Sequence, residues 1–149
     1  MNLANNSLVL VADGRKLLFL RNHGDEKQMD LHLEAHQEQD NPSTHKQGTD
    51  APGRSFAPNF ASGGRRSAME ETDYHQIAED RFAAEAADLL RDRALNGDFK
   101  TLVVVAPPRT LGELRRHYHK EVAARIVHEL NKDLTGFPIE EIEAALVSA

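Results

Sequence analysis

Residues 101–116 read TLVVVAPPRTLGELRR and pass from an unbroken apolar run into a charged, helix-forming segment. The run 102–106 is rich in Val and too short for a typical helix. It suits a strand buried on both faces, although periodicity alone leaves a buried helix open. Pro107 and Pro108 end the run, because neither can donate to a sheet ladder. Thr110 and Glu113 have the spacing of a capping box, which predicts a helix from Thr110. Residues 101–116 therefore predict the centre of an α/β domain.

Arg109 stands at the mouth of this predicted helix. The first N–H groups of a helix lack intrahelical partners, so a helix start is able to bind an anion. A start that merely caps itself is the commoner arrangement. The sequence leaves both interpretations open.

Three strands are predicted before this centre. Residues 7–12 and 16–21 are apolar runs joined by Asp13-Gly14, a strong hairpin signal because glycine tolerates the positive φ of such turns. Residues 29–34 alternate apolar and polar side chains, which is the pattern of a half-exposed strand. We expect a three-stranded meander whose third strand lies near an edge.

Helical patterns fill most of the second half. Asp73 is a plausible N-cap with Gln76 as its partner, and Asn96-Gly97 ends the predicted helix 73–95. A last helix is predicted from Pro138, with Glu140 and Glu141 in its first turn. Residues 120–131 fit a helix or a strand equally well. The apolar face of helix 73–95 comprises Ile77, Ala78, Phe82, Ala86, Leu89 and Leu90.

Residues 37–62 form a polar connection with few large apolar side chains. Such a long loop is uncommon inside a compact domain, and it is usually functional or disordered. We predict a mobile loop over about 37–62, with residues 37–52 the least ordered and 52–56 docked through Phe56.

Composition limits the class of protein. The 149 residues fit one domain, 1–149, and contain neither Cys nor Trp, so disulfides and Cys-ligated zinc are excluded. No segment has the apolar length of a membrane span or the form of a signal peptide, so we expect a cytoplasmic protein with no membrane partner. The net charge of −6 disfavours a generic nucleic-acid coat without excluding a local basic patch.

The predicted order is β-β-β-α-β-α-(β)-α. This order predicts an α/β fold with a mixed five-stranded sheet and flanking helices, of the ribonuclease H-like type, because right-handed crossovers favour the parallel part of that topology.

Four segments resemble the bacterial host attachment family, whose members are described as required for attachment to host cells. That family is related to the middle domain of archaeal and eukaryotic peptide-chain release factors. The resemblance covers nearly the whole chain and implies a ribonuclease H-like fold in which residues 125–131 form the last strand. The segments are 9–14 (VLVADG), 52–56 (PGRSF), 102–111 (LVVVAPPRTL) and 132–135 (KDLT).

The same resemblance draws attention to Gly63 and Gly64. In release factors a Gly-Gly-Gln loop before the long helix enters the peptidyl-transferase centre, where the Gln helps to place a water molecule. Here the third residue is Arg65, which offers donors and a charge but no carbonyl acceptor. We therefore expect no catalytic residue in this loop. A flexible basic loop that leads into a helix is the simpler interpretation.

Two segments concentrate positive charge. Between residues 54 and 69 all the charged side chains are basic, and residues 109–125 carry a net charge of +3. If these segments converge, they would form a patch for RNA phosphates, whereas a solvated helix face is the alternative. The candidate binding residues are Arg54, Gly63, Gly64, Arg65, Arg66, Arg109, Arg115 and Arg116.

Other chemistry has little support in the sequence. No carboxylate follows the strand 102–106 closely enough for a two-metal nuclease, and no zinc-binding His spacing or dinucleotide fingerprint is present. We expect no metal and no cofactor. The favoured hypothesis is a non-catalytic module that binds ribosomal RNA or tRNA. The alternatives are a hydrolase acting on peptidyl-tRNA or RNA through Gly63-Gly64, and a protein–protein adaptor acting indirectly in attachment to host cells.

Overall fold

The computed structural model describes residues 1–39 and 60–149. For residues 60–72 it describes the backbone and not the side chains. The strands of its sheet are β1 (Leu8–Ala12), β2 (Lys16–Asn22), β3 (Leu31–Glu38), β4 (Leu102–Val105) and β5 (Ile126–Leu130). The helices in this part of the chain are α2 (Phe60–Leu95), α3 (Pro108–His117), α4 (Lys120–Ala123) and α5 (Ile139–Val147).

The sheet is mixed and has the strand order β3-β2-β1-β4-β5. β1 pairs with β4 in parallel, with Leu10 opposite Val104, and β5 continues the parallel part. β2 and β3 extend the other side of the sheet as an antiparallel meander. All four residues of β4 are buried between two neighbouring strands, which confirms the interior strand predicted from its apolar run. Residues 120–131, for which the sequence fitted a helix or a strand, form both in turn: the short helix α4 and then the strand β5.

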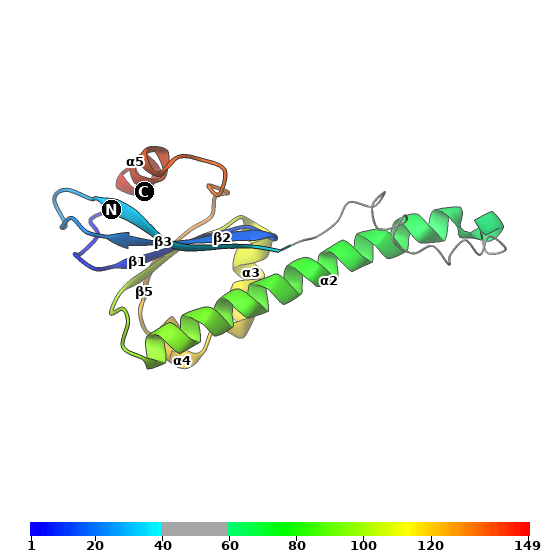
Figure 1. The fold of residues 1–149 in the computed structure, drawn as a ribbon, viewed down its shortest axis with the longest axis horizontal. Helices are drawn as coiled ribbons and strands as arrows, with labels where there is room; N and C mark the ends of the chain where they lie inside the picture. Colours follow the sequence, from blue (N-terminus) through cyan, green and yellow to red (C-terminus); the bar gives the residue numbers. More distant parts are fainter. Residues whose placement is uncertain (40–59) are drawn as a thin grey trace.

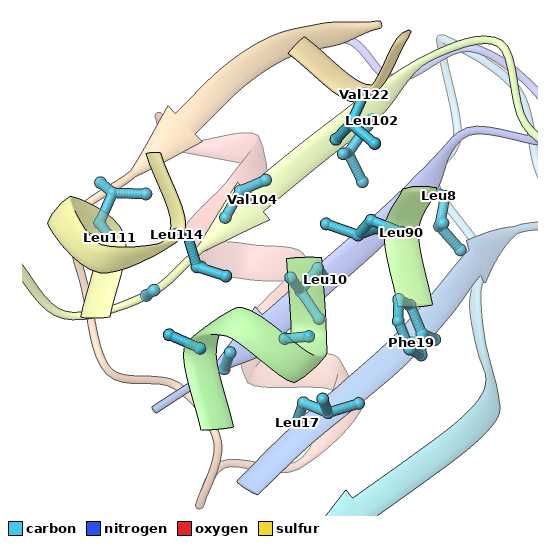
Figure 2. Packing of buried hydrophobic residues seen from close by; sticks show 14 of the residues in the cluster. Leu8, Leu10, Leu17, Phe19, Leu90, Leu102, Val104, Leu111, Leu114 and Val122 are labelled. Carbon is cyan, nitrogen blue, oxygen red and sulfur yellow. The ribbon is translucent and has the colours of Figure 1, made fainter. Parts of the chain in front are cut away.

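The sheet buries both faces because its central strands alternate between two cores. α2 and α3 cover one face and α5 covers the other (Figure 1). On the α2 side Leu10, Phe19 and Leu114 belong to one apolar cluster, as Figure 2 shows. On the α5 side Val9 and Ile142 belong to a second cluster. The mixed, helix-flanked α/β fold predicted from the sequence is thereby confirmed.

α2 is longer than predicted, because it begins at Phe60 and not after Asp73. A glycine in a helix interior costs only about 1 kcal/mol relative to alanine. Residues 67–71, SAMEE, are mostly good helix formers, so the two glycines do not stop the helix. The predicted end is confirmed: Gly97 has φ 69°, and its N–H and that of Asp98 bond to the carbonyls of Ala94 and Arg93. These two bonds make a Schellman motif.

Only the second half of α2 packs on the sheet. Phe82, Ala86 and Leu90 are buried there as predicted, whereas Ile77 is 55% exposed, contrary to prediction. The first half of α2 extends beyond the sheet in Figure 1, and Ile77 is the last residue of that half.

Two predicted local signals act differently in the structure. The capping box at Thr110 is wrong: α3 begins two residues earlier with Pro107 at the N-cap, so Thr110 is its third residue. Proline at the first helical position favours this earlier start. Asp13-Gly14 does form the β1–β2 turn, but Gly14 is not among the described residues with positive φ. A Cβ there would lie 2.7 Å from the Glu79 carboxyl carbon, so a larger residue at this position would require the flexible end of the Glu79 side chain to move.

Only the two ends of the predicted loop 37–62 lie in the part of the chain that the structure describes. Residues 37 and 38 belong to β3, and residues 60–62 belong to α2, so the prediction is wrong at both ends. Residues 40–59, which include Arg54 and Phe56, lie outside the described residues. No helix in the described ranges is long and apolar enough to cross a membrane.

Candidate nucleic-acid interface

The carboxyl ends of β1, β4 and β5 meet at one edge of the sheet, because these three strands are parallel. Asp13 follows β1, residues 107–109 follow β4, and residues 131–135 follow β5. Ligands of open α/β sheets usually bind outside this edge. Three of the four segments that carry the family resemblance therefore come together where a ligand is most expected.

Asp13 joins two of these segments, and both of its carboxylate oxygens accept hydrogen bonds. Its Oδ1 accepts hydrogen bonds from the N–H groups of Arg15 and Lys16, both at 2.7 Å. Its Oδ2 accepts the hydroxyl hydrogen of Thr135 at 2.8 Å. Thr135 is 7% exposed and lies 3.0 Å from the Oδ1 of Asp133. We call the Asp13–Thr135 bond the latch, since it fastens the segment after β5 to the end of β1.

The basic residues of α3 fall into two groups. Arg115 donates to Oε1 of Glu129 on β5 from Nε at 3.0 Å and from Nη2 at 2.8 Å, and these hydrogen bonds raise the pKa of Arg115. Arg116 pairs with Glu113 on its own helix at 3.2 Å. Arg109 is exposed, and its side chain makes no ion pair or hydrogen bond with any residue in the described ranges. Of the three predicted arginines, Arg109 therefore keeps its charge most available to a ligand.

Gly63, Gly64, Arg65 and Arg66 lie in the first turns of α2, within the helix and not in a loop before it. These turns are at the end of α2 that extends beyond the sheet, whereas α3 lies beside the other half of α2 (Figure 1). The structure thus does not bring residues 63–66 beside Arg109, Arg115 and Arg116. Two separate basic positions replace the single patch that the sequence suggested.

A charge network centred on a buried arginine links β2, β3 and the segment before β4, at the end of the sheet opposite to Asp13. The sequence did not indicate this network. Arg21 is 7% exposed and donates to Glu34 on β3 and to Asp98 after α2, at 3.0 and 2.8 Å. Arg93 of α2 pairs with the same two carboxylates. Burial alone would lower the pKa of Arg21, but its hydrogen bonds to Glu34 and Asp98 outweigh that effect and raise it. The hydrogen bond from Arg21 lowers the pKa of Glu34.

Two further observations concern titratable groups in the described residues. The described residues contain no cluster of three or more His, Asp or Glu side chains able to hold a metal ion. Burial raises the pKa of Tyr118, and its hydroxyl has no hydrogen-bond partner in the described part of the chain. A phenol held neutral in an apolar setting is not a ready base.

Comparison with known proteins agrees with this architecture. The model of a family described as bacterial archaeo-eukaryotic release factor family 12 matches residues 6–146. No curated protein matches the chain significantly. Because the match extends from the residues before β1 into α5, the chain belongs to bacterial archaeo-eukaryotic release factor family 12.

Proposed function

We propose that the protein is a non-catalytic module that binds ribosomal RNA or tRNA through the first turns of α2. The observation that carries the proposal is the placement of Gly63, Gly64, Arg65 and Arg66 at the end of α2 that extends beyond the sheet. Membership of a release-factor family supports a role at the ribosome.

Distance from the acidic body favours binding at this end. Arg65 precedes Ala78, a buried residue on the packed half of α2, by thirteen residues, which is about 20 Å of helix. At physiological ionic strength the Debye length is about 8 Å, so the net charge of −6 is largely screened at that distance. A phosphate backbone that approaches this end of α2 therefore meets the nearby charges of the helix, Arg65 and Arg66 against Glu70 and Glu71, more strongly than the charge of the body.

A helical backbone at Gly63 and Gly64 favours binding over hydrolysis. Unusual φ and ψ angles are what glycine offers to a catalytic loop, and a helix uses angles that any residue adopts. Arg65 supplies donors and charge, which suit phosphate, and lacks the acceptor needed to position a water molecule.

The experiment that tests the proposal is co-sedimentation with ribosomes over a series of salt concentrations. The variant Arg65→Glu with Arg66→Glu is compared with Lys27→Glu with Lys100→Glu, which changes the net charge equally at exposed lysines elsewhere. Losing two phosphate contacts should weaken binding and reduce the slope of log K against log salt by about 1.5. The lysine variant should behave as the wild type. Equal loss in both variants would mean that net charge alone governs binding.

The release-factor relationship also supports a second candidate, hydrolysis of peptidyl-tRNA. Arg65→Gln restores a Gly-Gly-Gln triplet and leaves both glycines in place. Under our proposal the wild type does not release peptide from peptidyl-tRNA. Release by the wild type that is unchanged in Arg65→Gln would refute the non-catalytic assignment. If no variant binds ribosomes or RNA at any salt concentration, the adaptor with an indirect effect on host attachment becomes the better hypothesis.

A further inference from the structure

A buried hydroxyl without a hydrogen-bond partner lies directly after α3. The Tyr118 hydroxyl oxygen is buried, and it has no hydrogen-bond partner among the described residues. Tyr118 packs against the apolar cluster on the α2 side of the sheet. Buried polar side-chain atoms nearly always have a partner, and leaving one without a partner costs stability. A phenol can donate one hydrogen bond, so this conformation leaves a donor unused.

Two charged groups, Arg115 and Glu129, act on this hydroxyl. Arg115 precedes Tyr118 by three residues, a spacing that makes side chains neighbours on a helix surface. Burial contributes most to the raised pKa of Tyr118, the negative charge of Glu129 adds to it, and the positive charge of Arg115 opposes it. The hydroxyl therefore lies within the field of the Arg115–Glu129 ion pair, which joins α3 to β5.

The ion pair leaves part of the Glu129 carboxylate unused. Arg115 donates from Nε and from Nη2 to the same carboxylate oxygen, Oε1. The other oxygen, Oε2, accepts no hydrogen bond from any described residue. The Arg115 side chain is 57% exposed and that of Glu129 only 22%. An exposed arginine can leave such a pair at little cost, whereas the less exposed carboxylate then needs another donor.

The surface of α3 around Arg115 favours a chain of phosphates as the ligand. Arg109 and Arg116 are about two helical turns apart, so they lie on one face of α3 with about 10 Å of helix between them. Gly112 lies between them, and open space surrounds the position of a Cβ there. Both arginines are exposed, and the acid of this helix, Glu113, is paired with Arg116 at 3.2 Å. Cations at this spacing exceed the reach of one phosphate group, and the flexible backbone of single-stranded RNA can follow them.

We propose that Arg115 exchanges Glu129 for the phosphodiester backbone of single-stranded RNA, and that the Tyr118 hydroxyl donates to Glu129 once Arg115 has left. The carboxylate then keeps a donor, and the buried hydroxyl gains the acceptor that it lacks in this structure. Tyr118 thus makes Arg115 available without contacting the RNA. The proposal goes beyond the function proposed above, because none of these residues belongs to the first turns of α2.

The exchange of partners is tested first without RNA, by a double-mutant cycle in urea denaturation. Arg115→Met should leave the midpoint of the wild type nearly unchanged, because Tyr118 replaces the lost donor to Glu129. In Tyr118→Phe the same change should lower the folding equilibrium constant about tenfold, as for one hydrogen bond to a charged group. Tyr74→Phe removes an exposed hydroxyl elsewhere and is the matched control, in which Arg115→Met should act as in the wild type. Additive effects of Arg115→Met and Tyr118→Phe overturn the exchange.

Binding is tested by titrating ¹⁵N-labelled protein with a short single-stranded RNA and following the Nε–H signal of Arg115 by two-dimensional NMR. The parent protein for this titration carries Arg65→Glu with Arg66→Glu, so binding at the first turns of α2 does not contribute. RNA should shift the Arg115 signal in a saturable manner, and more weakly at high salt.

In the same parent, Tyr118→Phe should weaken RNA binding about tenfold, because Glu129 would lose its replacement donor, whereas Tyr74→Phe should stay within about twofold of the parent. Dispersed spectra show that each variant is folded. Absence of a saturable shift at Arg115, or equal affinity in Tyr118→Phe and its parent, overturns the proposal. Ribosome binding that depends on Arg65 and Arg66 would be unaffected by either failure.

Discussion

At the scale of single residues, the charges that matter most for stability are those the structure removes from water. Arg21 has a side chain only 8% exposed and serves two carboxylates, Glu34 and Asp98, which are 32% and 39% exposed. Replacing Arg21 with Met should destabilise the fold by about 2 kcal/mol, less than loss of one partner from a fully buried pair because Arg93 still compensates both acids. Urea denaturation measures the change, and an unchanged midpoint would contradict it.

The same network makes a prediction about pH. The pKa values of Glu34 and Asp98 lie below their ordinary values of 4.5 and 3.8, so these groups bind protons more readily in the unfolded chain. Their contribution to stability is therefore complete above about pH 4.5 and is lost as the pH falls through the lowered values. The free energy of unfolding should fall on acidification below pH 4.5, and less steeply in Arg21→Met. Parallel pH profiles for the two proteins would rule out this origin.

At the scale of elements, the latch should control the connection between β5 and α5. Thr135→Val removes the hydroxyl that donates to Asp13 and should cost about 1–2 kcal/mol, because Asp13 Oδ2 loses its only partner in the described residues. Thr135→Ser keeps the hydroxyl and serves as the control. Hydrogen exchange should accelerate over residues 131–137 in the Val variant, whereas uniform acceleration over the whole chain would indicate a global effect only.

The long helix offers a second prediction at this scale. If α2 presents residues 63–66 as a helix, Gly63→Ala with Gly64→Ala should raise the helical circular dichroism, since alanine is favoured by about 1 kcal/mol at each site. Ribosome binding should persist or strengthen. Loss of binding in this variant, with Arg65 and Arg66 intact, would show that the glycines serve a loop conformation.

The sequence predicted some boundaries of the helices and strands and not others. Strand β4 and the end of α2 were predictable because a buried Val run and Asn-Gly act locally. The starts of α2 and α3 were not, because a cap-like residue such as Asp73 or Thr110 signals a helix start only when the preceding residues cannot be helical. The sequence predicted Arg65 and Arg66 in a loop, whereas they lie within α2, and no local pattern reports how far a 36-residue helix extends beyond the sheet that it covers.

At the scale of the whole molecule, the two basic positions lie at separate places on one scaffold. Residues 63–66 lie in the first turns of α2, at the end that extends beyond the sheet (Figure 1). Arg109 is the second residue of α3. The second half of α2 packs against α3 in one apolar core, whereas residues 63–66 precede the α2 residues that enter that core. A nucleic acid that touches both would have to follow the length of α2.

Additivity of mutational effects distinguishes separate positions from one patch. Effects at distant sites without shared partners usually add to within about 0.3–0.5 kcal/mol, whereas neighbours in one charged cluster do not. Ribosome binding is therefore measured for Arg65→Glu with Arg66→Glu, for Arg109→Gln, and for the triple variant. Under the geometry described here, the loss of binding free energy in the triple variant equals the sum of the other two losses. A triple loss that differs clearly from the sum would indicate that residues 63–66 meet Arg109 in the bound state, as the single patch suggested by the sequence would require. The salt dependence gives an independent check, because independent phosphate contacts each reduce the slope by the same increment.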